Sequence, residues 1–433
     1  MSYFYKPVIN GLLPKDWRLV SISEIADVRA GGTPSTKNPI YWGGDIPWMN
    51  SGEINLRRIK QVEGRITELG LNNSSTRLMP ANSVLMALAG QGKTRGKVAV
   101  NEFSLCTNQS LASIYNFDNA DYEFIFQNLE SRYSEIRKMS TGDGGRGGLN
   151  LRIINSIKIG LPPLPEQQKI AEILSTVDAK IEVIDQQITE TQELKKGLMQ
   201  RLLTKGIGHT EFKDSPLGKI PKSWEVDELE LIGIELIDGD RGHNYPKSKD
   251  FSNEGYCLFL SAKNVTKKGF KFDECQFISE NRDNLLRKGK LSRNDFVITT
   301  RGSVGHIAFY DDSIPYEHVR LNSGMVILRD SKRIFNTKFL YQLMKSPVFE
   351  VQIEFITSGS AQPQLTIKGL KKLKLPIPPI KEQLVIGDML STISSKLEIL
   401  AEKKNHYLEL KQGLMQQLLT GKVRVKLKTT ATA

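Results

Sequence analysis

The chain has 433 residues, of which 39% are hydrophobic and 25% are charged, and its formal net charge is +12. These proportions are typical of folded domains and exclude a disordered or collagen-like chain. At about 150 residues per domain, the length predicts two or three domains. Because no apolar run reaches about 18 residues and the first residues do not follow the pattern of a secretory signal, we expect a cytoplasmic protein without a membrane span. The excess of positive charge favours polyanionic partners.

Two segments of the chain resemble each other closely. The first starts at Leu161 and reads LPPLPEQQKIAEILSTVDAKIEVI, and the second starts at Ile377 and reads IPPIKEQLVIGDMLSTISSKLEIL. About 20 of 44 aligned positions are identical, which indicates an internal repeat. A weaker similarity relates the motif LPKDW, which ends at Trp17, to the motif IPKSW, which ends at Trp224. The sequence therefore predicts two tandem halves, each with a variable globular region and a long helix.

The globular regions, 1–160 and 207–376, are expected to be α+β domains. In the first region, short apolar runs at 83–88 and 97–100 predict strands, and 122–139 predicts a helix. In the second region, strands are expected at 296–299 and 306–309, and a helix at 337–355.

The repeated segments, 161–206 and 377–425, predict long helices that follow a proline cluster. Their apolar residues recur at steps of four and three, which is typical of a coiled coil. The pattern favours antiparallel pairing of the two helices within one chain, since both are held at high effective concentration. Pairing with a second molecule, which would make a homodimeric scaffold or a homodimer of the isolated chain, remains the alternative. Residues 426–433 are expected to form a flexible tail.

Basic, glycine-containing loops occur in both globular regions. Arg, Lys, Asn, Gln and Ser are the side chains that contact phosphates and base edges, although any single loop of this kind is more often a solvated turn. The candidate DNA-binding residues in the first region are Thr33, Lys37, Asn50, Lys93, Arg95, Lys97 and Arg146. Those in the second region are Arg241, His243, Tyr245, Lys263, Arg301, Ser303 and Gln362.

A phosphate-loop pattern, ALAGQGKT, ends at Thr94. Such a motif requires a helix directly after it, whose N-terminus binds the phosphates. The following residues, RGKVAV, predict a strand instead, so a nucleotide-binding protein is the weaker alternative. The five histidines and three cysteines are scattered, and no metal site or catalytic pair is evident in the sequence.

The order of variable domain, proline-led helix, variable domain and proline-led helix resembles the DNA-specificity subunits of type I restriction-modification systems. This resemblance covers nearly the whole chain, and it is based on the sequence motifs LPPLPEQQKIAEIL, KKGLMQRLLTKGIG and GLMQQLLTGKVRV. It implies two target-recognition domains, at 1–160 and 207–376, that each read one half of a bipartite, asymmetric double-stranded DNA site. It also implies that the helices 161–206 and 377–425 set the gap between the halves.

The resemblance further implies that the chain is not itself an enzyme. Its partners would be two methyltransferase subunits and two restriction subunits. S-adenosylmethionine, ATP and magnesium would be bound by those partners, and no cofactor is expected on this chain.

Overall fold

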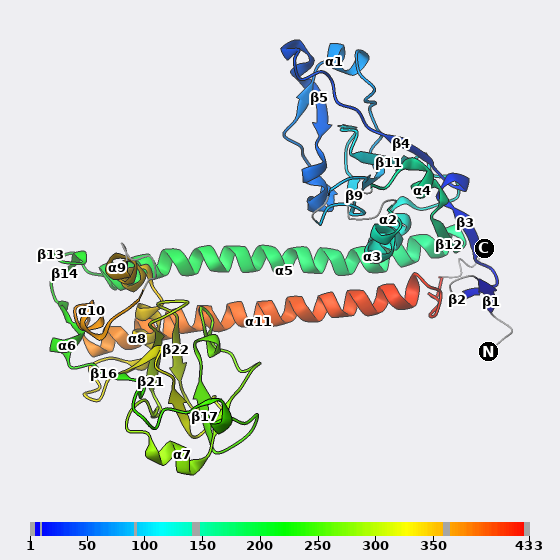
Figure 1. Ribbon diagram of the computed structural model, residues 1–433. Coiled ribbons are helices and arrows are strands. Elements are labelled where there is room, and N and C mark those ends of the chain that lie inside the picture. The colour runs from blue at the N-terminus through cyan, green and yellow to red at the C-terminus, as the bar shows by residue number, and fades with distance from the viewer. Residues whose placement is uncertain (1–4, 9–10, 91–92, 141–147, 358–363, 428–433) are drawn as a thin grey trace, which may run out of the picture. The chain divides into compact units, whose positions relative to one another are not determined.

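The computed structural model describes residues 5–8, 11–90, 93–140, 148–357 and 364–427 (Figure 1). The chain forms two compact units, Met1–Asp185 with Glu402–Ala433, and Gln186–Ala401. Each unit contains an α+β domain and part of both long helices, α5 (Leu164–Lys205) and α11 (Ile380–Leu418). Within the described ranges, no helix combines the length and the apolar character that crossing a membrane requires.

Two sheets form the domain of the first unit. The larger sheet has five strands, in the order β4 (Asp27–Ala30), β11 (Leu111–Tyr115), β8 (Val84–Ala87), β9 (Val98–Asn101) and β6 (Arg58–Ile59). The smaller sheet has three, in the order β10 (Cys106–Thr107), β5 (Trp42–Met49) and β7 (Arg65–Ile66). The remaining elements are β1 (Tyr5–Val8), β2 (Gly11–Pro14), β3 (Arg18–Ser21), α1 (Glu68–Asn72), α2 (Tyr122–Ser131), α3 (Tyr133–Lys138), α4 (Leu151–Ser156) and β12 (Lys158–Leu161).

The domain of the second unit repeats this plan. Its larger sheet has the order β16 (Glu235–Asp238), β24 (Met325–Arg329), β21 (Asp295–Thr299) and β22 (Ile307–Tyr310). Its smaller sheet has the order β20 (Phe277–Ile278), β17 (Cys257–Leu260) and β23 (Val319–Leu321). The other elements are β13 (Phe212–Ser215), β14 (Gly218–Pro221), β15 (Glu225–Glu228), α6 (Leu229–Ile232), β18 (Val265–Thr266), β19 (Gly269–Phe270), α7 (Glu280–Leu285), α8 (Thr337–Met344), α9 (Pro347–Thr357), α10 (Ile367–Lys371) and β25 (Lys374–Ile377).

The central strands are buried on both faces, which explains their continuous apolar runs. In β8, Val84 and Met86 pack into the core that contains α2, whereas Leu85 and Ala87 pack into a second core on the other face. Successive side chains of a strand point to opposite faces of the sheet, so a strand between two cores needs apolar residues at every position. The strands expected at 83–88, 97–100, 296–299 and 306–309 are confirmed as β8, β9, β21 and β22.

The helical stretches expected at 122–139 and 337–355 are confirmed, but each is divided into two helices. Arg132 separates α2 from α3, and its guanidinium donates to the Lys158 carbonyl at 2.7 Å. Pro347 starts α9, since a proline has no N–H to continue the preceding helix. The apolar periodicity continues across the first break because Leu129 and Ile136 belong to the same core.

The long helices run antiparallel within each unit. In the first unit, Ile170 and Leu174 of α5 share a core with Leu418 of α11. Further along α5, Asp185 pairs with Lys404 at 2.5 Å. In the second unit, Leu202 of α5 shares a core with Ile386 and Leu390 of α11.

Residue numbers therefore rise along α5 as they fall along α11, which confirms the predicted antiparallel coiled coil within one chain. Pairing with a second molecule would need apolar helix residues at the surface, but the core residues of α5 and α11 named above are buried within the single chain.

The repeated Glu-Gln pair fixes the start of each long helix. Gln167 donates to the Pro162 carbonyl at 2.8 Å and accepts from the Asp121 N–H at 2.8 Å. Gln383 makes the matching bonds to Pro378 and Asn336, also at 2.8 Å. Each amide thus ties the helix start to the residue that caps α2 or α8.

The glutamates of the same pair bind the far end of the other helix. Glu166 accepts from Trp17 Nε1 at 3.3 Å and pairs with Arg424, which follows α11, at 2.6 Å. Glu382 accepts from Trp224 Nε1 at 2.9 Å and contacts His209, which follows α5, at 2.9 Å. These contacts explain why the tryptophan motifs, the Glu-Gln pairs and the helix ends all recur in the sequence.

Candidate functional site

Four loops of the first domain meet at one edge of its two sheets. They follow β4, β5, β8 and β10, and backbone bonds join them in pairs. The Gly32 N–H donates to the Thr107 carbonyl at 2.8 Å, and the Asn108 N–H donates to the Met49 carbonyl at 3.0 Å. The Leu88 N–H donates to the Ser110 carbonyl at 2.9 Å. The edge therefore presents side chains from distant parts of the sequence on one connected surface.

The second domain builds the same edge from the loops after β16, β17, β21 and β23. The Asn322 N–H donates to the Leu260 carbonyl at 3.0 Å, and the Thr300 N–H donates to the Gly324 carbonyl at 2.8 Å. A side chain could not replace Gly239, because its Cβ would lie 2.2 Å from the Asn322 oxygen. In the first domain, a Cβ on Gly31 would lie 2.2 Å from the Thr107 carbonyl oxygen. The two domains thus share one loop framework with different side chains.

The candidate residues of the first domain fall into three groups. Lys37 and Lys93 are exposed, and Lys97, which is half-buried, donates to Asn55 Oδ1 at 2.6 Å. Thr33 and Asn50 support their loops, since Thr33 bonds Gln109 at 2.5 Å and Asn50 Oδ1 accepts from the Gly52 N–H at 2.8 Å. The third group consists of Arg95, which is buried. Arg146 lies outside the described residues.

In the second domain, Arg241, His243, Lys263, Arg301 and Ser303 are exposed. Arg241 donates to the Ser323 carbonyl at 3.3 Å, which places it against the loop after β23. Lys263 follows β17 and pairs with exposed Glu274 at 3.2 Å.

Two other candidates of this domain are placed differently. The ring of Tyr245 packs edge-on against Phe259 at 5.7 Å, so it supports the fold of its loop. Gln362 lies outside the described residues.

The structure adds side chains that sequence reasoning missed. With its amide oxygen facing the guanidinium, Gln364 accepts from Arg301 Nη2 at 3.1 Å, which orients that arginine. Arg287, whose side chain is 76% exposed, lies beside the loop of Arg241 because its N–H donates to Asp240 Oδ2 at 2.7 Å. Asn108 and Asn322 occupy equivalent places in the two edges, since each N–H donates to the last carbonyl of a neighbouring strand. The asparagine that recurs in the two halves of the sequence could have revealed this equivalence.

Asp240 folds the loop that carries Arg241 and His243. Its side chain is buried, and its Oδ1 accepts from the Gly242 N–H at 2.7 Å. That backbone hydrogen bond, with further help from Arg287, lowers the pKa of the Asp240 carboxyl. A carboxylate that stays ionised fixes the turn and keeps the neighbouring basic side chains at the surface.

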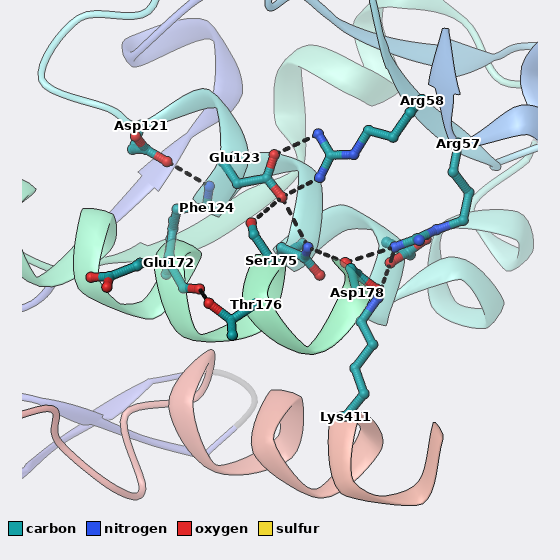
Figure 2. A network of polar contacts seen from close by, with 12 residues as sticks. Arg57, Arg58, Asp121, Glu123, Phe124, Glu172, Ser175, Thr176, Asp178 and Lys411 are labelled. Atoms are coloured by element: carbon teal, nitrogen blue, oxygen red, sulfur yellow. Dashed lines mark hydrogen bonds and ion pairs between the residues drawn. The ribbon is translucent and has the colours of Figure 1, made fainter. Parts of the chain in front are cut away.

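A buried ion-pair network joins the first domain to both long helices (Figure 2). Lys411 of α11 pairs with Asp178 of α5 at 2.8 Å and with Glu130 of α2 at 2.9 Å. Arg57 donates to Asp178 at 3.1 Å and also pairs with Glu130. Burial alone would raise the pKa of Glu130, but Arg57 and Lys411 outweigh it, and the pKa is lowered. The network therefore orients the domain on the helices through charges that are satisfied inside the unit.

The described residues hold no cluster of His, Cys, Asp and Glu that fits a metal ion. After Thr94 the chain continues into β9, and no helix begins between them, as the sequence predicts. A helix N-terminus that could bind a nucleotide phosphate is therefore missing at the phosphate-loop pattern.

Comparison with known proteins agrees with this geometry. The family described as type I restriction modification DNA specificity domain matches residues 14–193 and 221–410. The MjaVIII specificity subunit of Methanocaldococcus jannaschii is 27% identical over 96% of this chain and 96% of its own length. The EcoKI specificity subunit of Escherichia coli K12 is 19% identical over 96% of this chain and 90% of its own length.

A solved structure has the same fold. The S subunit of a type I restriction-modification system from M. genitalium superposes with a TM-score of 0.62 at 18% identity, over 93% of this chain and 96% of that one. The family match falls on both halves and includes part of each long helix. The chain thus belongs to the type I restriction-modification DNA specificity family, whose members recognise DNA targets.

Proposed function

We propose that this chain reads a bipartite, asymmetric DNA site, one half with each domain. The observation that carries this proposal is the loop edge that is built twice on one framework with different side chains. Equal frameworks would dock on DNA in the same way, whereas unequal side chains would select different bases. We assign 1–160 and 207–376 to recognition, 161–206 and 377–425 to the spacer helices, and 426–433 to a tail.

In this proposal, the exposed basic residues of each edge contact phosphates and base edges in the major groove. Phosphate contacts supply salt-dependent affinity, and base contacts supply the sequence preference. Exposed Arg241, Arg301 and Arg287 form such a set in the second domain. Arg301, which is oriented by Gln364, is the residue best prepared for a bidentate contact with guanine.

We also propose that the chain works without catalysis of its own and recruits enzyme subunits. The family and the relatives named as specificity subunits support this role. Because the repeated helices give the chain an internal pseudo-twofold, it offers two similar docking surfaces, one for each of two methyltransferase subunits. Two restriction subunits would complete the complex. S-adenosylmethionine, ATP and magnesium would then be bound by those subunits.

Arg301→Ala tests the assignment of the second edge. We expect the affinity for the cognate site to fall about 10- to 100-fold, with the base preference relaxed in one half-site only. Binding is measured with the full chain, alone and with its methyltransferase subunits, against libraries randomised in either half-site. Arg201→Ala, which removes an exposed arginine from α5, is the matched control. Unchanged preferences in both half-sites would contradict the assignment of Arg301.

A further inference from the structure

An exposed glutamine, Gln109, occupies the turn between β10 and β11 at the recognition edge of the first domain, the edge that its four loops form. Asn108 closes this turn with two bonds. Its Oδ1 accepts from the Ser110 N–H at 3.1 Å, and its carbonyl accepts from the Leu111 N–H at 3.1 Å. The turn therefore holds the backbone of Gln109 at a fixed place on the edge.

The loop after β4 packs directly against this turn. A Cβ on Gly31 would lie 2.4 Å from the Asn108 carbonyl oxygen, so only a glycine allows the two backbones to come so close. The next carbonyl of the loop, that of Gly32, accepts from Trp48 Nε1 at 3.0 Å. Thr33 follows directly and is thus held beside the turn.

Thr33 orients the amide of Gln109. Its hydroxyl Oγ1 donates to Gln109 Oε1 at 2.5 Å. Among the described residues, this is the only hydrogen bond of the Gln109 side chain. The Oε1 atom keeps a second lone pair, and Nε2 keeps both of its protons. The amide therefore presents an acceptor and a donor to a ligand, in an orientation that is already restricted before binding.

An acceptor beside a donor matches adenine in the major groove. Adenine presents the N6 amino group as a donor next to the N7 acceptor, and a glutamine amide bonds both at once. The major-groove edge of guanine presents two acceptors, and a phosphate presents acceptors alone, so neither would use the lone pair of Oε1. The arrangement therefore favours adenine as the ligand of Gln109.

The second domain carries different side chains at the same place. Asn322 closes its turn in the same way, because its Oδ1 accepts from the Gly324 N–H at 2.9 Å. The residue between them is Ser323, whose carbonyl accepts from Arg241 Nη2 at 3.3 Å. An amide is thus replaced by a short hydroxyl side chain and a guanidinium, which is the group that pairs with guanine.

We propose that Gln109 reads an adenine in the first half-site and that Thr33 is its positioning residue. This inference rests on the proposed function and deepens it, since it names a base and the side chain that selects it. The second domain, with Ser323 and Arg241 at the equivalent place, would not select adenine there.

The test uses Gln109→Ala and Gln109→Glu in the full chain with its methyltransferase subunits, against libraries randomised in either half-site. Gln109→Ala should reduce the discrimination at one A·T pair of the first half-site about 5- to 100-fold and leave every other position unchanged. Gln109→Glu adds a negative charge, so the total affinity should fall. The remaining preference at that pair should move to cytosine, whose N4 amino group donates to a carboxylate.

Thr33→Val tests the positioning role, because it removes the hydroxyl and keeps the branched shape. We expect the discrimination at the same A·T pair to fall about fivefold, as the loss of one hydrogen bond implies, while the other positions keep their preferences. Thr33→Ser retains the hydroxyl and should restore the native discrimination. A residue that only stabilised the fold would instead weaken binding to all sequences alike.

Gln168→Ala, which removes an exposed glutamine from α5, is the matched control and should leave both half-sites unchanged. The preference for the second half-site reports in each variant that the chain is folded. Unchanged discrimination in Gln109→Ala, or relaxation at a G·C pair or in the second half-site, would overturn the inference while the proposed function stands. If the native chain showed no sequence-specific binding at all, the proposed function itself would fail.

Discussion

Deleting one heptad from each long helix should shorten the preferred gap between the half-sites by about three base pairs. The ion pairs show that facing residues of α5 and α11 have a constant sum of residue numbers, since Asp178 faces Lys411 and Asp185 faces Lys404. By that rule residues 188–194 face 395–401, and both segments can be removed together with the register preserved. Seven residues span about 10 Å of helix, and a base-pair step rises about 3.4 Å.

The gap is measured by sequencing the sites that the variant methylates in cells that supply the methyltransferase. Each half-site should keep its bases, because neither recognition edge is altered. A control variant replaces the two heptads with others of equal length and should keep the native gap. If the shortened chain still methylates sites with the native gap, the helices do not set the spacing.

Lys411→Met should lower the free energy of unfolding by about 2–3 kcal/mol. The substitution leaves Glu130 and Asp178 in a largely buried place, where their side chains are only 23% and 13% exposed. Removing one partner of a buried ion pair typically costs about 3–5 kcal/mol, and Arg57 compensates part of that loss. Chemical denaturation of the full chain, followed by circular dichroism, measures the change.

The matched variant Lys195→Met should behave in the opposite way. Lys195 occupies the equivalent position in the second half, where Lys345 replaces Glu130 and the charge of Lys195 lowers the pKa of Lys345 in addition to burial. Its removal relieves a repulsion, so the free energy of unfolding should stay the same or rise. Equal losses in both variants would contradict the charge asymmetry between the halves.

The same network predicts a dependence of stability on pH. Burial raises the pKa of Asp178, but Arg57 and Lys411 outweigh it, so its pKa lies below the ordinary value of 3.8, as that of Glu130 lies below 4.5. Carboxyls with a lowered pKa stabilise the fold fully above their unfolded values and lose that contribution as the pH falls through the folded ones. The difference in unfolding free energy between the native chain and Lys411→Met should therefore shrink below about pH 4.

The long helices and the repeat could be predicted because their signals are local. Proline clusters, heptad spacing and repeated motifs each lie within a few turns of helix, and they place the starts of α5 and α11 to within a few residues, whereas α11 ends before the predicted segment does. The break between α8 and α9 falls just before Pro347, a sequence signal that the single stretch expected at 337–355 did not use. The bonds of Gln167 and Gln383 show why a Glu-Gln pair recurs, although the sequence alone did not reveal its partners.

The recognition edges could be predicted only in outline. Basic loops are visible in the sequence, but their assembly depends on bonds between distant residues, such as Gly32 with Thr107 or Arg287 with Asp240. Burial is equally invisible, so Arg95 could not be distinguished from exposed Lys93. Arg287 and Gln364 were missed because only the folded chain brings them beside Arg241 and Arg301.

The most direct test is the methylation pattern that this chain deposits when it is produced with its methyltransferase subunits. Two different recognition edges on one polypeptide predict a single non-palindromic sequence, made of two short defined blocks separated by a gap of constant length. A palindromic site, one continuous block, or a gap that varies from site to site would contradict the account.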